Sequence, residues 1–260
     1  MLVRSLCRFA LLTCLLISWP ILAAVYEIDV KEGAHKFDPN SKPSDKDNKY
    51  LASVTVKKDG KVVASDIRAS TLPDAWMFYV RWNVELKRTS PPKDAEIIAM
   101  FDHFEEQTKR YRESGTKLGN TPLADIADIM DVLNRIPAIP SGEYRFVTGL
   151  HRNNSGPHGR PYAVRLLGGA EERPFDPAVP KSEATVVGGF IRTLNKNNAQ
   201  GQRKMANGIN VHDGRPSRDY KDSEGCLTIH PDHWSKFIKS LPSPEEWARD
   251  KHTGKLILTR

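Results

Sequence analysis

The sequence contains little cysteine, with three residues in a chain of 260. Two of them, Cys7 and Cys14, lie within the segment 1–24, so Cys226 is the only thiol in the rest of the chain. Outside that first segment, a fold stapled by intramolecular disulfide bonds is therefore excluded. A single thiol leaves two interpretations, a buried structural residue or a reactive nucleophile, and its neighbours must decide between them.

Long hydrophobic runs are absent after residue 24, which excludes a further membrane-spanning helix. The apolar run at residues 9–22 follows Arg4 and Arg8 and ends in Ala23 and Ala24. A basic start, an apolar segment too short to span a bilayer and an exit of small residues predict a signal peptide over residues 1–24. We expect export to a bacterial periplasm or cell envelope, without stable membrane insertion after cleavage; an uncleaved anchor is the alternative.

Acidic residues are outnumbered by basic ones. The segment 1–24 holds two of the 39 basic residues and none of the 32 acidic ones, so the remainder has a formal net charge of +5. A basic exported protein tends to associate with anionic polymers, which in a bacterial envelope include peptidoglycan. Composition alone does not separate peptidoglycan from nucleic acid. The remainder, 25–260, is long enough for one large domain with a hydrophobic core of its own.

Two segments with different patterns follow the predicted signal peptide. Residues 25–49 are polar, rich in Lys, Asp and Pro and weakly periodic, which predicts an exposed arm or a loosely attached strand. From residue 50 apolar and polar residues alternate, and the pair Asp59-Gly60 interrupts the alternation. This pattern predicts a β-hairpin with a two-residue turn at the start of a domain over residues 50–260.

A helical pattern occupies residues 94–136, where the apolar period changes from two to about three and a half. The first helix is expected to end near Gly115, and Thr121-Pro122 begins a second one that Pro137 ends. Short strands are predicted at 144–147, 162–166 and 209–212, followed by a late helix at 231–241 and a closing strand at 255–259. The predicted fold is mainly β, sandwich-like or barrel-like, with a helical insertion and a late helix, or α+β overall.

Two short segments carry side chains suited to nucleophilic catalysis. His212 ends one predicted strand at a glycine-containing turn, and Cys226 begins another after Ser223-Glu224-Gly225. If these strands are neighbours, the two side chains meet at one end of the sheet. An imidazolium beside a thiol stabilises the reactive thiolate. Gly225 lets the backbone approach a substrate closely, and the amides of residues 225 and 226 are candidates for an oxyanion hole.

With these residues in view, the sequence resembles the catalytic domain of the L,D-transpeptidases of the YkuD type, whose signature is a His-Gly turn followed by Ser/Thr-His-Gly-Cys. The resemblance extends to the hairpin at 51–71, to Ile139–Phe146 and to Pro161–Leu166, and it spans residues 50 to 235. Three positions depart from the family pattern, because Glu224 replaces a histidine, Thr228 an arginine and Asp213 a glycine, and the gap between His212 and Cys226 is short. The changes leave the nucleophile and the base intact and bear on substrate specificity.

The resemblance implies a mechanism on peptidoglycan stem peptides. Cys226 attacks the amide after the third residue, a diamino acid, and the terminal D-amino acid leaves. An amine then resolves the acyl-enzyme into a cross-link or an exchanged stem, whereas water gives L,D-carboxypeptidase activity. His212 acts as base and then as acid, oriented through its other nitrogen by a backbone carbonyl near Asp213 or by the Asp213 side chain. Ser223 positions the turn, Glu224 is expected to point outward, and no cofactor is required.

Other chemical roles and functions stay open from the sequence. A zinc site of Cys226 with the His230-Pro-Asp-His233 segment is one alternative, but capping of the late helix is the favoured interpretation, so no metal is expected. A papain-like protease is disfavoured, because there the cysteine precedes the histidine. The alternative function is a non-catalytic peptidoglycan-binding protein that retains the fold, and nucleic acid is not expected as a partner. Candidates for the substrate cleft, or else for loop, rim or core positions, are His151, Tyr162, Arg165 and Thr228.

Overall fold

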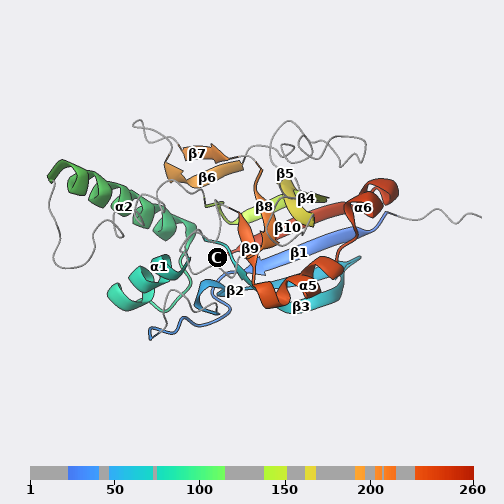
Figure 1. Ribbon diagram of the computed structural model, residues 1–260, viewed down its shortest axis with the longest axis horizontal. Helices are drawn as coiled ribbons and strands as arrows, with labels where there is room; N and C mark the ends of the chain where they lie inside the picture. Colours follow the sequence, from blue (N-terminus) through green and yellow to red (C-terminus); the bar gives the residue numbers. More distant parts are fainter. Residues whose placement is uncertain are drawn as a thin grey trace, which may run out of the picture.

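A closed β-barrel of eight strands occupies the centre of the computed structural model (Figure 1). The structure describes residues 23–40, 47–72, 75–114, 138–150, 162–167, 191–196, 203–206, 208–214 and 226–260. In order around the barrel the strands are β1 (Val25–Lys31), β10 (Thr253–Thr259), β4 (Gly142–Leu150), β5 (Tyr162–Leu167), β8 (Asn210–Asp213), β9 (Leu227–Ile229), β3 (Lys61–Ser70) and β2 (Ala52–Lys58).

Two pairs of strands in the barrel are parallel, β1 with β10 and β8 with β9, and the other neighbouring strands are antiparallel. A separate two-stranded sheet, β6 (Ile191–Lys196) and β7 (Arg203–Ala206), lies beside the barrel in Figure 1. The expectation of a mainly β fold is therefore confirmed. The predicted strands at 144–147, 162–166, 209–212 and 255–259 correspond to β4, β5, β8 and β10.

The hairpin of β2 and β3 turns at the two residues that the sequence singles out. Asp59 and Gly60 have φ angles of +50° and +76°. A two-residue turn with positive φ at both central positions matches the right-handed twist of the flanking strands, and Asp-Gly is suited to it. Lys58 and Lys61 pair across this turn, which confirms the predicted hairpin.

The prediction of an exposed arm over residues 25–49 is wrong for its first part. Residues 25–31 form β1, which lies between β10 and β2 in the closed barrel. Tyr26, Ile28 and Val30 point into the core. The acidic residues between them, Glu27 and Asp29, lie on the outer side and pair with lysines of neighbouring strands. Residues 26–31 alternate strictly between apolar and charged, the pattern of a half-buried strand, and the polar residues that follow them made this short signal easy to overlook.

The folded barrel begins before Val25. The backbone N–H of Ala24 donates to His252 Nδ1 at 3.0 Å, and its carbonyl accepts from the Thr253 N–H at 3.2 Å. Apart from residues 23 and 24, the predicted signal peptide lies outside the described residues and stays a prediction. Within the described ranges, the structure contains no helix that is both long enough and apolar enough to cross a membrane.

Helices lie beside the barrel. The first helix of the predicted insertion is α2 (Asp94–Ser114), and the late helix is α5 (Pro231–Lys239), which contacts β3. The second helix of the insertion, predicted to begin at Thr121-Pro122, lies outside the described residues. Helices that the sequence interpretation missed are η1 (Asp47–Lys49), α1 (Ala75–Tyr79), the π-helical segment η2 (Val80–Glu85) and α6 (Pro244–Asp250).

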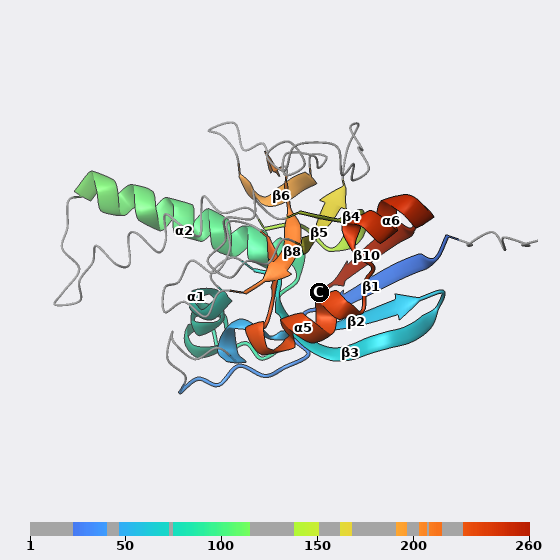
Figure 2. The same cartoon turned by 45° about the vertical axis from the view of Figure 1, so that its right-hand side comes forward.

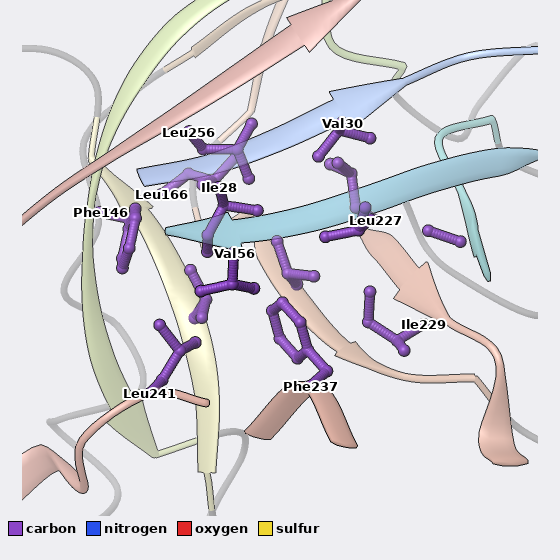
Figure 3. Close-up of a cluster of buried hydrophobic side chains, with 14 of the residues drawn as sticks. Ile28, Val30, Val56, Phe146, Leu166, Leu227, Ile229, Phe237, Leu241 and Leu256 are labelled. Atoms are coloured by element: carbon purple, nitrogen blue, oxygen red, sulfur yellow. The ribbon is translucent and has the colours of Figure 1, made fainter. Parts of the chain in front are cut away.

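Two apolar cores stabilise the molecule. The larger fills the barrel, where side chains from the strands meet those of α5 (Figure 3). The smaller lies between α1, η2 and α2, and its largest fully buried members are Trp82, Phe78 and Phe101. Figures 1 and 2 show α2 extending away from the barrel beyond this second core. The helical segments are therefore anchored by a core of their own beside the barrel.

Buried polar groups connect the two cores. The guanidinium of Arg260, with a fully buried side chain, forms an ion pair with Asp94 at 2.9 Å and donates to the Ile139 carbonyl at 2.9 Å. Its second terminal nitrogen donates to the Thr71 carbonyl at 3.3 Å. A charge removed from water must be compensated by a partner and by hydrogen bonds, and these contacts supply both. They join the end of β10 to the start of α2.

A second buried group, Glu32, lies just after β1. Its carboxylate, in a residue that is 3% exposed, accepts hydrogen bonds from the hydroxyls of Thr71 and Tyr79. Burial, reinforced by the negative charge of Glu32, raises the pKa of the Tyr79 hydroxyl well above its usual value. Tyr79 therefore stays protonated and can donate, which ties α1 to the barrel.

Replacing Ile28 by alanine tests the place of β1 in the barrel. Because Ile28 is 0% exposed, Ile28→Ala should lower the free energy of unfolding by about 3 kcal/mol. Val25→Ala is the matched control, since Val25 lies in the same strand but is 53% exposed, and its effect should stay within about 0.5 kcal/mol. Urea denaturation followed by tryptophan fluorescence measures both. Equally small effects would mean that β1 is a loosely attached arm.

Candidate active site

The strands that carry His212 and Cys226 are neighbours. β8 and β9 run parallel, with Val211 opposite Leu227 and His212 opposite Thr228. Cys226 directly precedes β9. The sequence interpretation required the two strands to be adjacent and left their relative direction open. The structure brings them together at the centre of the molecule, between β5 and β3 (Figure 1).

Alternation along these strands separates an apolar face from a polar one. Val211, Leu227 and Ile229 belong to the barrel core, so His212 and Thr228, which alternate with them, lie on the opposite face. Continuing the register by one residue sets Cys226 opposite Asn210. Neighbouring strands extend this polar face with Arg165 of β5, which pairs with Asn210, and with Ser70 of β3, which pairs with Thr228.

Access to the polar face is uneven. Arg165, Asn210, Thr228 and Ser70 are buried, whereas His212 and Cys226 are only half-buried. His212 and Cys226 are diagonal neighbours on this face of β8 and β9. Diagonal neighbours on adjacent strands are close enough for long side chains to interact. The two members that retain access to solvent are therefore the thiol and the imidazole, a pair suited to nucleophilic chemistry.

The imidazole of His212 is oriented by the backbone. Its Nδ1 lies 2.7 Å from the carbonyl oxygen of Asp213. A carbonyl oxygen only accepts hydrogen bonds, so Nδ1 carries the proton and Nε2 of the neutral ring is the nitrogen able to take one up. Of the two orienting groups expected from the sequence, the carbonyl of Asp213 makes this contact. The contact fixes the orientation of the ring and leaves Nε2 able to accept a proton, as a general base would need.

The sulfur of Cys226 lies against the turn that precedes β8. The backbone N–H of Asn210 donates to Sγ at 3.4 Å, and Sγ lies 3.9 Å from the carbonyl oxygen of Gly208. The Asn210 side-chain amide donates to the same carbonyl at 2.7 Å, which holds the turn closed. Gly208 has a φ of +67°, a left-handed conformation that favours glycine. The turn therefore presents a backbone donor to the thiol.

Arg165 of β5 lies on the same polar face, with its guanidinium carbon 4.0 Å from the position that a Cβ atom on Gly149 of β4 would take. Burial lowers the pKa of its guanidinium to about 10, and the charge of Cys226 acts in the opposite direction. A pKa of about 10 keeps the guanidinium protonated at neutral pH. Arg165 was one of four residues expected in a substrate cleft. The structure shows it 4% exposed, as a buried residue of the polar face.

Glycine is required where β8 ends. The N–H of Gly214 donates to the Ile229 carbonyl at 2.8 Å. A Cβ atom on residue 214 would come within 1.9 Å of the Tyr50 hydroxyl oxygen and 2.9 Å of the Ile229 carbonyl oxygen. The glycine after His212-Asp213 thus allows Tyr50 to pack beneath the turn. This contact gives a steric reason for the His-x-Gly sequence.

Several expected site residues are not placed. His151, Ser223, Glu224 and Gly225 lie outside the described residues, as does the side chain of Tyr162. The candidate oxyanion hole at residues 225 and 226 therefore stays a prediction. Thr228 is among the described residues. It lies opposite His212 and is 1% exposed, so it is a buried residue of the polar face.

The histidines after β9 have structural contacts. His230 Nδ1 accepts a hydrogen bond from the Asp232 N–H at 3.2 Å, which makes His230 the N-cap of α5. His233 Nδ1 accepts from the Arg68 N–H at 2.8 Å. The prediction that this segment caps the late helix is confirmed. Both Nδ1 atoms act as acceptors, so these contacts need unprotonated Nδ1 nitrogens.

The sequence interpretation missed two features of the site. It did not consider Asn210, and it did not connect Arg165 with Cys226. Each is a polar residue between apolar neighbours in a strand, in Ile209-Asn-Val211 and in Val164-Arg-Leu166. A polar residue in such a run is a signal of burial with a specific partner. The partner follows only from the pairing of strands that are distant in sequence.

A pocket of about 480 Å³ opens at a different place, between the segment after β1 and η2. Its wall includes His35, Phe37, Tyr79 and Asn83, but neither His212 nor Cys226. Phe37 and Tyr79 stack there with ring centroids 6.1 Å apart. This pocket is therefore distinct from the polar face of β8 and β9.

Comparison of the chain with models of known protein families, with curated proteins and with solved structures finds no match.

Acid conditions should destabilise the protein through His230. Burial lowers the pKa of His230, with His233 and Arg68 acting in the same direction and Asp232 and Asp47 opposing it. The folded state therefore takes up a proton less readily than the unfolded chain, whose histidine has its ordinary pKa of about 6.5. Stability should be fully present above that pH and should fall progressively below it.

The measurement is the free energy of unfolding in urea at a series of pH values from about 7.5 to 5.5. His230→Asn is the matched variant, because asparagine is also a good N-cap but does not titrate. It should show a shallower loss of stability on acidification than the unchanged protein. Part of the slope should remain, since burial also lowers the pKa of His35. An identical slope in both proteins would exclude His230 as a source.

Proposed function

We propose that this chain is a cysteine-dependent peptidoglycan L,D-transpeptidase that acts on stem peptides through an acyl-enzyme. The observation that carries the proposal is the placement of Cys226 and His212 on one face of two adjacent parallel strands. The contact between His212 Nδ1 and the Asp213 carbonyl supports the assignment of His212 as the base. The order of the two residues, the barrel and the blocks that resemble the YkuD-type domain support this fold family.

The proposed reaction has two steps, acylation of Cys226 and attack on the resulting thioester. The Cys226 thiolate forms a bond to the carbonyl carbon of the diamino acid. The bond between that carbon and the nitrogen of the terminal D-amino acid breaks. The protonated imidazole of His212 gives its proton to the departing amine. An incoming amine then attacks the thioester, His212 Nε2 takes its proton, and the carbon–sulfur bond breaks to restore the thiolate. Water in place of the amine gives L,D-carboxypeptidase activity.

Stabilisation of the tetrahedral intermediate requires donors beside Cys226. In the proposal these are the backbone amides of residues 225 and 226, with Ser223 positioning the turn. Thr228 and Arg165 are both buried on the polar face of these strands. Recognition of the stem peptide is therefore assigned to other residues, and in the proposal Glu224, in place of the family's histidine, adjusts specificity.

Localisation and partner follow from the same proposal. The predicted signal peptide would deliver the enzyme to the periplasm or cell envelope, where peptidoglycan is found. A formal net charge of +5 outside the segment 1–24 favours association with an anionic wall polymer. The substrates are stem peptides, and the reaction as written uses protein side chains alone.

The decisive experiment is incubation of the purified protein with defined muropeptides, with products read by mass spectrometry. The protein should remove or exchange the terminal D-amino acid, and Cys226→Ala should abolish the products. His212→Gln should lower turnover by about 10²-fold or more, because a general base is lost. Val63→Ala, on the exposed hairpin, is the matched control and should leave turnover unchanged.

Two results would overturn the proposal. Product formation that persists in Cys226→Ala would exclude the thiol as nucleophile. Binding of the muropeptides without any product, equal in the unchanged protein and in Cys226→Ala, would instead favour a peptidoglycan-binding protein that retains the fold.

A further inference from the structure

Three exposed apolar side chains gather at one end of the barrel. Val25, at the start of β1, is 53% exposed, and Val62 and Val63, near the start of β3, are 59% and 47% exposed. They are three of the five large apolar residues that are exposed in the described part of the chain. Figures 1 and 2 show the start of β1 and the turn of the β2–β3 hairpin at the same end, away from α2. Single exposed apolar residues are common, but a group of them indicates an interaction surface.

Hydrogen bonds hold the start of β1 against the turn of the hairpin. The N–H of Val25 donates to Asp59 Oδ1 at 2.9 Å, and the N–H of Asp59 donates to the Val25 carbonyl at 2.8 Å. In β3 the pairing with β2 passes from Val62 to Ala64 through a register shift, which leaves Val63 between them as a bulge residue. A bulge turns a side chain away from the regular course of its strand. The three valines therefore lie on one fixed part of the barrel.

Two lysines flank these valines, one on each side of the turn. Lys58 and Lys61 pair across the hairpin, and both are exposed. Neither forms an ion pair with an acidic residue in the described ranges. The acidic residue of the turn, Asp59, already accepts the Val25 N–H. Cations and aliphatic side chains thus occur together here, and the term hairpin-end surface denotes Val25, Lys58, Lys61, Val62 and Val63.

The most apolar part of the sequence ends next to this surface. The run at residues 9–22 stops three residues before Val25. Three residues of extended chain span at most about 11 Å. A bilayer that holds this run, during export or as an uncleaved anchor, is therefore connected to Val25 by a link no longer than that.

A lipid bilayer offers a partner to both kinds of side chain. Aliphatic groups enter the boundary between headgroups and acyl chains, while ammonium groups contact anionic headgroups. An anionic wall polymer would attract Lys58 and Lys61, but it provides no apolar phase for the valines. A second copy of the chain fits less well, because a symmetric contact would bring lysines against lysines. The combination of side chains favours an anionic bilayer.

We propose that the hairpin-end surface docks the protein on an anionic lipid bilayer, with its valines in the interface and its lysines on lipid phosphates. The docking is peripheral and reversible, so it agrees with the expectation of no stable membrane insertion. The inference goes beyond the proposed function, because it assigns a partner that the reaction on stem peptides does not require. It would hold the candidate site, on β8 and β9, close to the membrane.

The test is co-sedimentation with sucrose-loaded vesicles of phosphatidylglycerol and phosphatidylcholine in equal parts, or of phosphatidylcholine alone. The protein is used without residues 1–22, so that the apolar run does not contribute; this form keeps every described strand and helix. Its partition coefficient should be about tenfold or more higher on the anionic vesicles. Lys58→Gln combined with Lys61→Gln should remove most of that difference.

The valines are tested by a matched pair of double variants. Val62→Ser combined with Val63→Ser should lower the partition coefficient on anionic vesicles about fivefold or more, because apolar area leaves the interface. Val84→Ser combined with Leu86→Ser is the control, since these residues of the η2 region are 43% and 41% exposed and follow α1 in the chain. The control should bind like the unchanged protein. Circular dichroism identifies a variant that does not fold, in which case Val62→Ser alone replaces the double variant.

Each outcome decides for or against the docking surface. Absence of binding to anionic vesicles overturns the proposal, and so does an equal loss of binding in the control. Binding that persists without the valines shows that charge alone attracts the protein to lipid, which also overturns it. Binding to purified peptidoglycan sacculi, but not to vesicles, that depends on the two lysines would assign the surface to a wall polymer instead. Loss of vesicle binding confined to the hairpin-end variants supports the proposal, whether or not muropeptides are turned over.

Discussion

The parallel pairing of β8 with β9 is the constraint on which the candidate site depends. A shift of one residue in this pairing would turn every side chain of one strand to the other face. The register is held by apolar residues, because Val211 and Leu227 must enter the barrel core together. The same pairing then sets His212 and Cys226 on the outside. The packing of the core therefore determines where the imidazole and the thiol lie, although the core residues are not part of the candidate site.

The outer face of these strands is unusual for a barrel, because it is polar and yet largely buried. Arg165, Asn210 and Thr228 are each less than a tenth exposed. Buried polar residues destabilise a fold unless each finds a partner, and sequences depart from simple patterning most often at functional sites. The half-buried thiol and imidazole lie where this face opens to solvent. Buried polar neighbours combined with solvent access at the thiol and the imidazole are more typical of a reactive site than of a structural one.

The sequence alone was enough to predict those parts of the fold that depend on interactions between residues a few positions apart. The hairpin with Asp59-Gly60, the first helix of the insertion and the helix capped at His230 were predicted because turns, caps and periodicity act over a few residues. β1 was missed because its six alternating residues were interpreted together with the polar residues that follow them, up to residue 49. α6 was missed although Ser243 and Glu246 form a capping box, a signal that the interpretation left unused. The parallel strand pairs depend on contacts across long stretches of chain, which periodicity does not encode.

The same difference between local and long-range signals applies to the candidate site. His212 and Cys226 were found because their residue types and spacing suggest a nucleophile with its base. The contact of the imidazole with a carbonyl near Asp213 could be anticipated, since the two groups are adjacent in sequence. The place of Arg165 on the same polar face could not, because it depends on the pairing of β5 with β8, two strands that are distant in sequence. A buried charge near a candidate site is therefore the part that sequence motifs describe least well, because it can come from any neighbouring strand and its burial depends on the fold rather than on its position in the chain.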